Sequence, residues 1–220
     1  MTFIVVPAYN EEKKIGRVIR DLFNHGFKNL VVVDDGSIDS TISEVKKTEA
    51  KLLRHLVNRG QGAALQTGDD YCIKNNADLV VHFDADGQFL AKDIVGAIEF
   101  MKSKNVDVLL GSRFLDNRSS TPFLKKYIIL PVSRWINLMF TGVKLTDAHN
   151  GFRILNKKSL EKIQIIQDGM AHNSEIISQI KKYQLTFVEY PVEVIYHEYG
   201  QGIGGGFKIL RDLVVGRFLE

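Results

Sequence analysis

The sequence predicts an α/β fold, in which helices cover both faces of a sheet of mainly parallel strands. Short apolar runs alternate with helical patterns through the first half of the chain, which is typical of parallel strands joined by crossover helices. These runs are apolar almost throughout, as expected where helices cover both faces of a sheet. With 220 residues, 45% hydrophobic and 25% charged, the composition indicates a globular domain and excludes fibrous and disordered proteins.

Apolar runs place the first five strands at Phe3–Val6, Leu30–Val33, Lys51–Leu56, Leu79–Phe83 and Val106–Leu110. Between the first two strands, apolar residues recur at the helical spacing and form one stripe: Ile15, Val18, Ile19, Leu22 and Phe23. Asn10 is the expected N-cap of this helix. Two further strands, Phe152–Leu155 and Leu185–Val188, are expected on either side of a helix over Ser174–Lys182.

Two segments of the second half are apolar but interrupted by charges. Phe123–Leu145 contains several basic residues and Pro131, so we expect one or two amphipathic helices instead of a membrane span. Phe207–Leu219 is expected to form a last helix, which could pack on the core or lie in a lipid interface.

The charge balance limits the possible partners. The chain has 29 basic and 26 acidic residues, a net charge of +3, which is too balanced to indicate general nucleic-acid binding. Residues 1–110 carry 14 basic and 16 acidic residues, while residues 111–220 carry 15 and 10, an asymmetry that suits a cation on one side and a phosphate or membrane surface on the other. Ordinary variation in surface charge would also explain it.

Two further features indicate the compartment. Cys72 is the only cysteine and can form no internal disulfide, which is typical of a reducing compartment. No secretory signal is evident, because the apolar run at the start is short. We therefore expect a cytoplasmic protein.

The polar residues best suited to catalysis or ligand binding follow the first five strands. In a sheet of parallel strands, such loops leave the same edge and form one site. The five loops are Pro7–Glu12, Asp34–Ser37, Asn58–Gly62, Asp84–Gln88 and Gly111–Phe114.

Asp84 and Asp86 predict a metal site. Residues i and i+2 at a strand end project to the same side, and two close carboxylates repel each other unless a cation lies between them. Hard oxygen ligands select Mg²⁺ or Mn²⁺, with a substrate phosphate in the shell, and Gln88 offers a neutral oxygen. The alternative is a surface turn rich in Asp and Gly.

Two other loops could contact a nucleotide. Asp35 could accept hydrogen bonds from a nucleobase or ribose. Gly60 and Gly62 open a helix whose backbone amides favour an anion, although no P-loop or dinucleotide fingerprint occurs here. Arg113 and Arg153 could each bind a phosphate, and a salt bridge to a neighbouring carboxylate is the alternative.

The five loops, in this order and together with Thr146-Asp147 and Gly151-Phe152-Arg153, resemble the family 2 glycosyltransferases of GT-A fold. Within that family, the chain is similar to the dolichyl- or polyprenyl-phosphate sugar synthases. The resemblance implies a Rossmann-like mixed sheet flanked by helices. The sequence shows no internal repeat or linker-like stretch, so we expect one domain over residues 1–220, with a nucleotide-sugar half at 1–115 and an acceptor and membrane-facing half at 116–220.

The resemblance assigns roles to individual residues. Residues that would hold the nucleotide-sugar are Pro7, Ala8, Tyr9, Glu11, Asp35, Gly62 and Asp84. Residues that would bind Mg²⁺ or Mn²⁺ are Asp84, Asp86 and Gln88. Residues on the acceptor side would be Arg113, Arg134, Asp147, Asn150 and Arg153, and Phe123–Leu145 would meet the membrane surface. Asn150 departs from the family pattern, where a serine is more usual, and the loop at 196–202 lacks the expected basic residue.

The implied reaction is an inverting transfer of a sugar from a nucleotide-diphospho-sugar to a polyprenyl phosphate or a glycan precursor, with Asp86, Arg113 and Asp147 as catalytic residues. Asp147 would serve as a base only if the acceptor were a hydroxyl. Contact with the cytoplasmic face of a membrane would be peripheral. Two alternatives stay open at this point: a sugar-phosphate nucleotidyltransferase and a non-catalytic protein that binds nucleotide-sugars.

Overall fold

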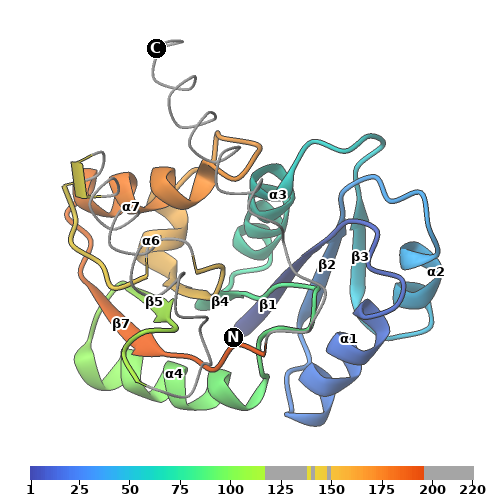
Figure 1. Ribbon diagram of the computed structural model, residues 1–220, viewed down its shortest axis with the longest axis horizontal. Helices are drawn as coiled ribbons and strands as arrows, with labels where there is room; N and C mark the ends of the chain where they lie inside the picture. Colours follow the sequence, from blue (N-terminus) through green and yellow to red (C-terminus); the bar gives the residue numbers. More distant parts are fainter. Residues whose placement is uncertain (117–137, 140–141, 148–149, 196–220) are drawn as a thin grey trace, which may run out of the picture.

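The computed structural model describes residues 1–116, 138–139, 142–147 and 150–195, and its centre is one seven-stranded sheet (Figure 1). Its order is β3-β2-β1-β4-β6-β5-β7. The strands are β1 (Thr2–Ala8), β2 (Leu30–Asp34), β3 (Lys51–Arg54), β4 (Leu79–His82), β5 (Val108–Ser112), β6 (Arg153–Asn156) and β7 (Phe187–Pro191).

The sheet is mixed, as expected. Strands β1 to β4 pair in parallel, and β7 pairs in parallel with β5. Strand β6 lies between β4 and β5 and runs antiparallel to both, so the other six strands all point the same way. The loops that follow β1 to β5 therefore leave the same edge, which we call the carboxyl edge.

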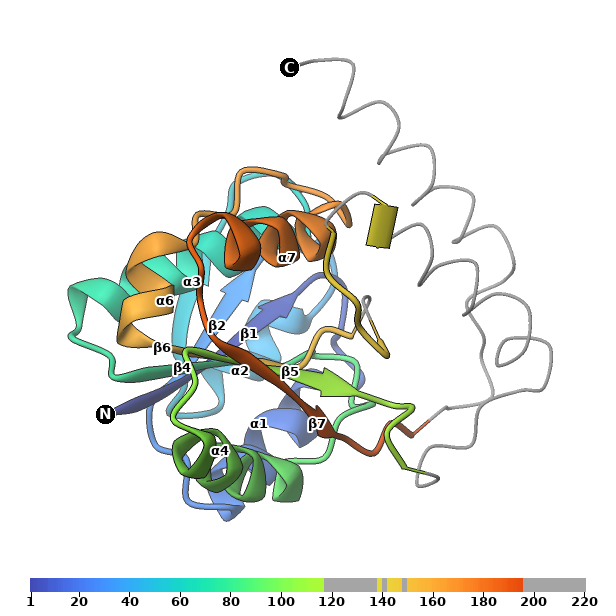
Figure 2. The ribbon, with the colours of Figure 1, turned by 90° about the vertical axis from the view of Figure 1, so that its left-hand side faces the viewer.

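Helices cover both faces of the sheet, which confirms the predicted layers. They are α1 (Ile15–Asn24), α2 (Thr41–Lys46), α3 (Gln61–Lys74), α4 (Lys92–Lys104), α6 (Lys157–Lys162) and α7 (His172–Lys182). Helices α1 and α4 lie on one face, and α3, α6 and α7 lie on the other (Figure 2). Strand β1 contributes to both apolar cores because its side chains alternate, Ile4 toward α1 and Val5 toward α3.

Several local predictions are wrong. Strands β5 and β7 each begin two residues later than predicted. Asn10 is not the N-cap of α1, which begins at Ile15; the Asn10 backbone is left-handed, with φ of 55°, and its Oδ1 accepts from the amide of Ile38 at 3.0 Å. Strand β3 ends at Arg54, two residues earlier than predicted. The Leu56 side chain, 94% exposed, therefore lies in a loop at the surface.

The amphipathic segments fall largely outside the described residues. Of Phe123–Leu145, Leu138 and Met139 are exposed and Val143 and Leu145 are buried, and the predicted helix at Phe207–Leu219 lies wholly outside. Among the helices that the structure describes, none combines the length and apolar character needed to cross a bilayer.

Asp107 joins three elements where β5 begins. Its carboxylate accepts from Lys158 Nζ at 2.8 Å, from the Thr186 amide at 2.9 Å and from Asn156 Nδ2 at 3.2 Å. Burial opposes ionisation, but these hydrogen bonds, led by that of Lys158, lower the pKa of Asp107 from 3.8 to about 2.

Replacing Asp107 by Asn should therefore flatten the acid limb of the stability curve. A carboxyl group whose pKa is lowered by folding stabilises the native state fully above its unfolded pKa, and this contribution is lost as pH falls toward the folded pKa. Wild-type protein should lose more free energy of unfolding than the variant between about pH 4 and pH 2. Urea unfolding at several pH values measures the difference, and parallel curves would contradict the assignment.

Gly68 allows α3 to approach β1 closely, because a Cβ atom there would collide with Cγ1 of Val5. Gly68→Ala should lower the free energy of unfolding by about 1–2 kcal/mol, since overpacking outweighs the better helix propensity of Ala. Adding Val5→Ala should recover part of the loss. Gly169→Ala is the matched control, because nothing lies within 4 Å of its added Cβ. A stabilised Gly68→Ala variant would refute the close approach.

Candidate active site

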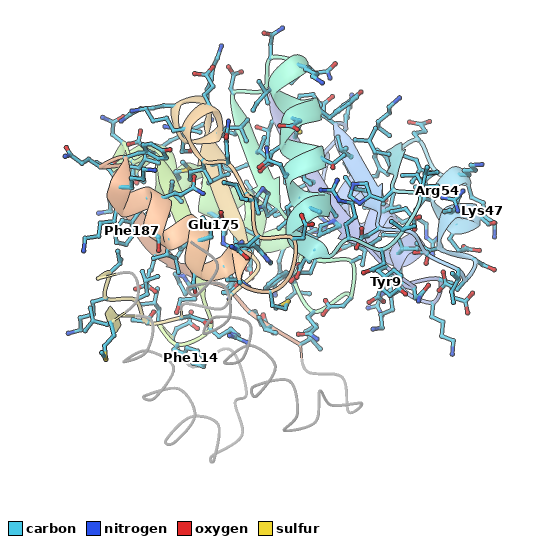
Figure 3. All side chains as sticks on the ribbon, turned by 90° about the horizontal axis from the view of Figure 1, so that it is seen from above. Tyr9, Lys47, Arg54, Phe114, Glu175 and Phe187 are labelled. Carbon is cyan, nitrogen blue, oxygen red and sulfur yellow. The ribbon has the colours of Figure 1, made fainter. Side chains whose placement is uncertain are left out.

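The five polar loops gather at the carboxyl edge. Figure 3, which looks onto the face covered by α3 and α7, shows Tyr9 after β1 and Phe114 after β5 well apart along its lower side. Strands β2, β1 and β4 are neighbours in the sheet. The loops after β2, β3 and β4 therefore lie near Tyr9 or between Tyr9 and Phe114.

The loops after β1 and β2 are fastened to each other. The Asp35 amide donates to the Ala8 carbonyl at 2.8 Å, and the Glu11 amide donates to Thr41 Oγ1 at 2.8 Å. Pro7 and Ala8 pair with the end of β2. The structure thus brings together five of the predicted donor residues: Pro7, Ala8, Tyr9, Glu11 and Asp35.

Tyr9 and Glu11 differ in their environments within this group. The Tyr9 side chain is 45% exposed, so its ring is accessible from the carboxyl edge. Glu11 is partly buried, and burial raises its pKa, while Lys14, whose Nζ lies 3.4 Å from Glu11 Oε2, opposes that rise. Asp86 adds a smaller rise, which indicates that the loop after β4 lies close to this group.

Asp35 organises the loop that follows β3. Its Oδ1 accepts from His55 Nδ1 at 2.7 Å and from the Arg59 amide at 3.0 Å, and its Oδ2 accepts from the Gly60 amide at 2.7 Å. The side chain is 3% exposed. This internal role was not predicted from the sequence, which gave no sign that His55 would turn back toward β2.

The expectation of free amides at the start of α3 is wrong. The amide of Gly62 donates to the Asp168 carbonyl at 2.8 Å, and Ala63 donates to the same oxygen at 3.4 Å. A Cβ atom at Gly62 would collide with the Gln167 carbonyl oxygen. The loop after α6 therefore caps this helix, and these two amides face a protein carbonyl instead of an anion.

Asp84 and Asp86 lie together after β4. Asp84 Oδ1 accepts from Gln61 Nε2 at 2.8 Å, a partner that the sequence did not suggest. Burial, and next the charge of Asp86, raise the pKa of Asp84 to about 6. Asp86 Oδ1 accepts from the amide of Gln88 at 2.9 Å, so Gln88 contacts the pair through its backbone.

The charge around this pair suits a divalent cation. The negative charge of Asp86 raises the pKa of Asp84, an effect that a cation between the two carboxylates would oppose, and hard oxygen ligands are those that Mg²⁺ and Mn²⁺ prefer. Among the described residues, no three His, Cys, Asp or Glu side chains group closely enough to hold an ion by themselves. The described residues thus offer the carboxylates of Asp84 and Asp86 here.

Arg113 and Asp147 form a two-pronged ion pair. Arg113 Nε donates to Asp147 Oδ2 at 2.6 Å, its second guanidinium nitrogen donates to Oδ1 at 2.7 Å, and its amide donates to Oδ2 at 3.1 Å. Burial opposes ionisation of Asp147, but the hydrogen bonds and charge of Arg113 hold its pKa below the usual range. Such a carboxylate is a poor proton acceptor, which argues against Asp147 as the base.

Two other predicted acceptor residues are buried. Asn150 is 5% exposed, and its Nδ2 donates to Asp147 Oδ2 at 3.3 Å. Arg153 is 1% exposed and donates to the Asn150 carbonyl at 3.1 Å and to Asn173 Oδ1. Burial lowers the pKa of Arg153 to about 10, and Asp84 opposes this effect, so the guanidinium stays charged. Arg153 therefore lies buried beneath the site and stabilises it instead of facing a ligand. Arg134 lies outside the described residues.

Glu189 on β7 is another contributor that the sequence did not reveal. Its Oε1 accepts from the Thr146 amide at 2.8 Å and from Thr146 Oγ1 at 2.7 Å. These bonds hold the segment before Asp147 against the sheet. A glutamate within a short apolar strand at 187–191 gives only a weak sequence signal of such a role. The role becomes evident only from the pairing of β7 with β5.

Asp35→Asn should loosen the loop after β3. The amide side chain keeps one acceptor oxygen and presents an NH₂ group to donors, so the free energy of unfolding should fall by about 1–3 kcal/mol. Hydrogen exchange at the Arg59 and Gly60 amides should accelerate. Asp70→Asn on exposed α3 surface is the matched control, and unchanged protection of both amides in Asp35→Asn would contradict the role.

Comparison with known proteins gives the family. The model of glycosyl transferase family 2 matches residues 3–164. An uncharacterized protein of Methanocaldococcus jannaschii is 36% identical over 97% of this chain and 90% of its own length. UDP-N-acetylglucosamine–dolichyl-phosphate N-acetylglucosaminyltransferase of Methanococcus voltae is 31% identical over 98% and 95%.

Solved structures agree on the fold. Glucosyl-3-phosphoglycerate synthase of Mycobacterium tuberculosis in complex with UDP is similar with a TM-score of 0.73 and 16% identity, over 98% of this chain and 79% of that one. Its complex with Mn²⁺, UDP and glucosyl-3-phosphoglycerate gives 0.71 and 15%, over the same shares. The fold is that of the GT-A glycosyltransferases, and the chain belongs to glycosyl transferase family 2.

Proposed function

We propose that this protein transfers a sugar, with inversion, from a nucleotide-diphospho-sugar to a polyprenyl phosphate. One observation carries the proposal: the acidic pair Asp84 and Asp86 lies at the carboxyl edge beside the group formed by Tyr9, Glu11 and Asp35. A nucleotide bound by that group would direct its diphosphate toward the pair.

The names of relatives support both substrates. The Methanococcus voltae relative is named for UDP-N-acetylglucosamine and dolichyl phosphate. A relative from Trichomonas vaginalis, 30% identical over 96% of this chain and 71% of its own length, is named a dolichyl-phosphate beta-glucosyltransferase. We infer a sugar nucleotide as donor and a lipid phosphate as acceptor, at the cytoplasmic face of a membrane.

On the donor side, Pro7, Ala8 and Tyr9 would hold the nucleobase, with Glu11 and Asp35 near the ribose. Asp84 and Asp86, with Gln88 adjacent, would hold Mg²⁺ or Mn²⁺. A bound divalent ion neutralises the charge that develops on a diphosphate leaving group. The Gln61 amide fixes one oxygen of Asp84 and so orients that carboxylate.

On the acceptor side, Arg113 would bind the lipid phosphate, with Arg134 and Asn150 nearby. The ion pair with Asp147 orients the Arg113 guanidinium and keeps it at the end of β5. A phosphate oxygen is already ionised near neutral pH, so its attack on the sugar needs no strong base. The lowered pKa of Asp147 makes it a poor base, which agrees with a reaction that needs none. In our proposal, Asp147 therefore serves to position Arg113.

Asp86→Ala should abolish transfer and leave the fold intact, because Asp86 is half-buried in a turn after β4 and its Oδ1 accepts from the backbone amide of Gln88 two residues on. Loss of an interaction worth several kcal/mol should reduce kcat by at least about a hundredfold. The assay is nucleoside diphosphate release from a panel of sugar nucleotides with polyprenyl phosphate and Mg²⁺ or Mn²⁺. Chelation of the metal should stop the same reaction.

Asp70→Ala is the matched control, since Asp70 is an exposed carboxylate away from the carboxyl-edge loops. Circular dichroism would establish that both variants fold. Full activity of Asp86→Ala would refute the role of the pair. Pyrophosphate release by the wild type would favour a nucleotidyltransferase, and calorimetric binding of the donor without turnover would favour a non-catalytic binding protein.

A further inference from the structure

A groove of about 530 Å³ runs along α1, on the side of the molecule next to Asp86. One wall is α1 itself, and the other is the chain after β4, with Gly87, Phe89 and Leu90, together with Ile195. The two walls meet where a Cβ atom at Gly87 would lie 3.8 Å from Val18 Cγ2. Helices α1 and α4 share this face of the sheet (Figure 2).

The rim of the groove is basic. Lys13, Lys14, Arg17 and Arg20 line it, against the acidic side chains of Asp21 and Asp86. Lys14 is paired with Glu11. In the part of the chain that the structure describes, Lys13, Arg17 and Arg20 form no ion pair or hydrogen bond through their side chains. Three neighbouring cations that are not held in direct ion pairs repel one another, and a bound anion would reduce that repulsion.

The floor of the same groove is apolar. Val18, Phe83 and Phe89 are each less than 10% exposed, and their atoms form the base between the cations. Phe83 and Phe89 pack edge to face, with ring centroids 5.8 Å apart, so this base is rigid. A basic rim above an apolar base suits a ligand that carries a negative group on an apolar body, and the volume lies in the range of ligand sites.

We propose that this groove binds the phosphate headgroup of an anionic membrane phospholipid, with the start of its acyl chain against the half-buried Leu90 beside the Phe83 and Phe89 base. The phosphate would lie between Lys13, Arg17 and Arg20. Arg17 and Arg20 are three residues apart on α1, Lys13 lies in the turn before it, and all three line the groove, so they can contact one headgroup or two adjacent ones. The site is separate from the acceptor residues around Arg113, and it does not require transfer activity.

Binding to vesicles tests the proposal without any sugar nucleotide or polyprenyl phosphate, so its result is independent of the proposed reaction. Full-length protein would be sedimented with phosphatidylcholine vesicles that contain phosphatidylglycerol. The triple variant Lys13→Gln, Arg17→Gln, Arg20→Gln should bind on the order of a hundredfold more weakly, from about fivefold for each cation near an anionic surface. The control Lys74→Gln, Lys102→Gln, Lys104→Gln removes the same charge from the ends of α3 and α4.

A second variant examines the apolar part. Leu90→Asn should weaken vesicle binding while all cations remain, and titration with inorganic phosphate distinguishes a lipid from a free anion. Equal losses in the two triple variants would overturn the groove assignment, because they would indicate binding by general surface charge. Absence of vesicle binding by the wild type, or phosphate binding as tight as vesicle binding, would overturn the lipid assignment.

Discussion

The buried guanidinium of Arg153 is the charge on which the polar layer beneath the site depends. Because β6 runs opposite to its neighbours, its first residue lies at the edge where β4 and β5 end, and Arg153 pairs across the sheet with His82. Asp84, Asp69 and Asp147 all favour its charged form. A buried cation is tolerated only with such partners, and the carboxylates in turn need the cation. The reversed strand thus supplies positive charge at the edge where the acidic loops after β2 and β4 lie.

Donor and acceptor sides of the edge are stabilised by different means. Near β1 and β2, backbone amides and short side chains fasten one loop to the next, and the Asp35 carboxylate accepts from three donors. Near β5, a charged pair between Arg113 and Asp147 performs the same function, supported by Glu189. The hydrogen-bonded loops on the donor side leave the exposed ring of Tyr9 accessible. The ion pair on the acceptor side instead holds the charge of Arg113 in a fixed position.

Much of the fold could be predicted because buried parallel strands have continuous apolar sequences, and the order of loops then follows from strand direction. Local details could not be predicted where a distant partner decides them. Asn10 resembles an N-cap in sequence, but the amide of Ile38 holds it in a left-handed turn. Gly62 resembles an anion loop, but the Asp168 carbonyl occupies its amide. Arg153 could bind a phosphate as far as the sequence shows, but the antiparallel insertion of β6 buries it.

The cap on α3 couples parts of the chain that are far apart in sequence. Residues 60–63 and 167–168 meet there, and a guanidinium nitrogen of Arg59 also lies 3.5 Å from Asp168 Oδ1. A chimaera that exchanged only the early loops with those of a relative would separate the helix from the carbonyl that completes it. Loop exchanges meant to change the specificity of an enzyme in this family should therefore transfer both segments together, since the conformation of each segment depends on its contacts with the other.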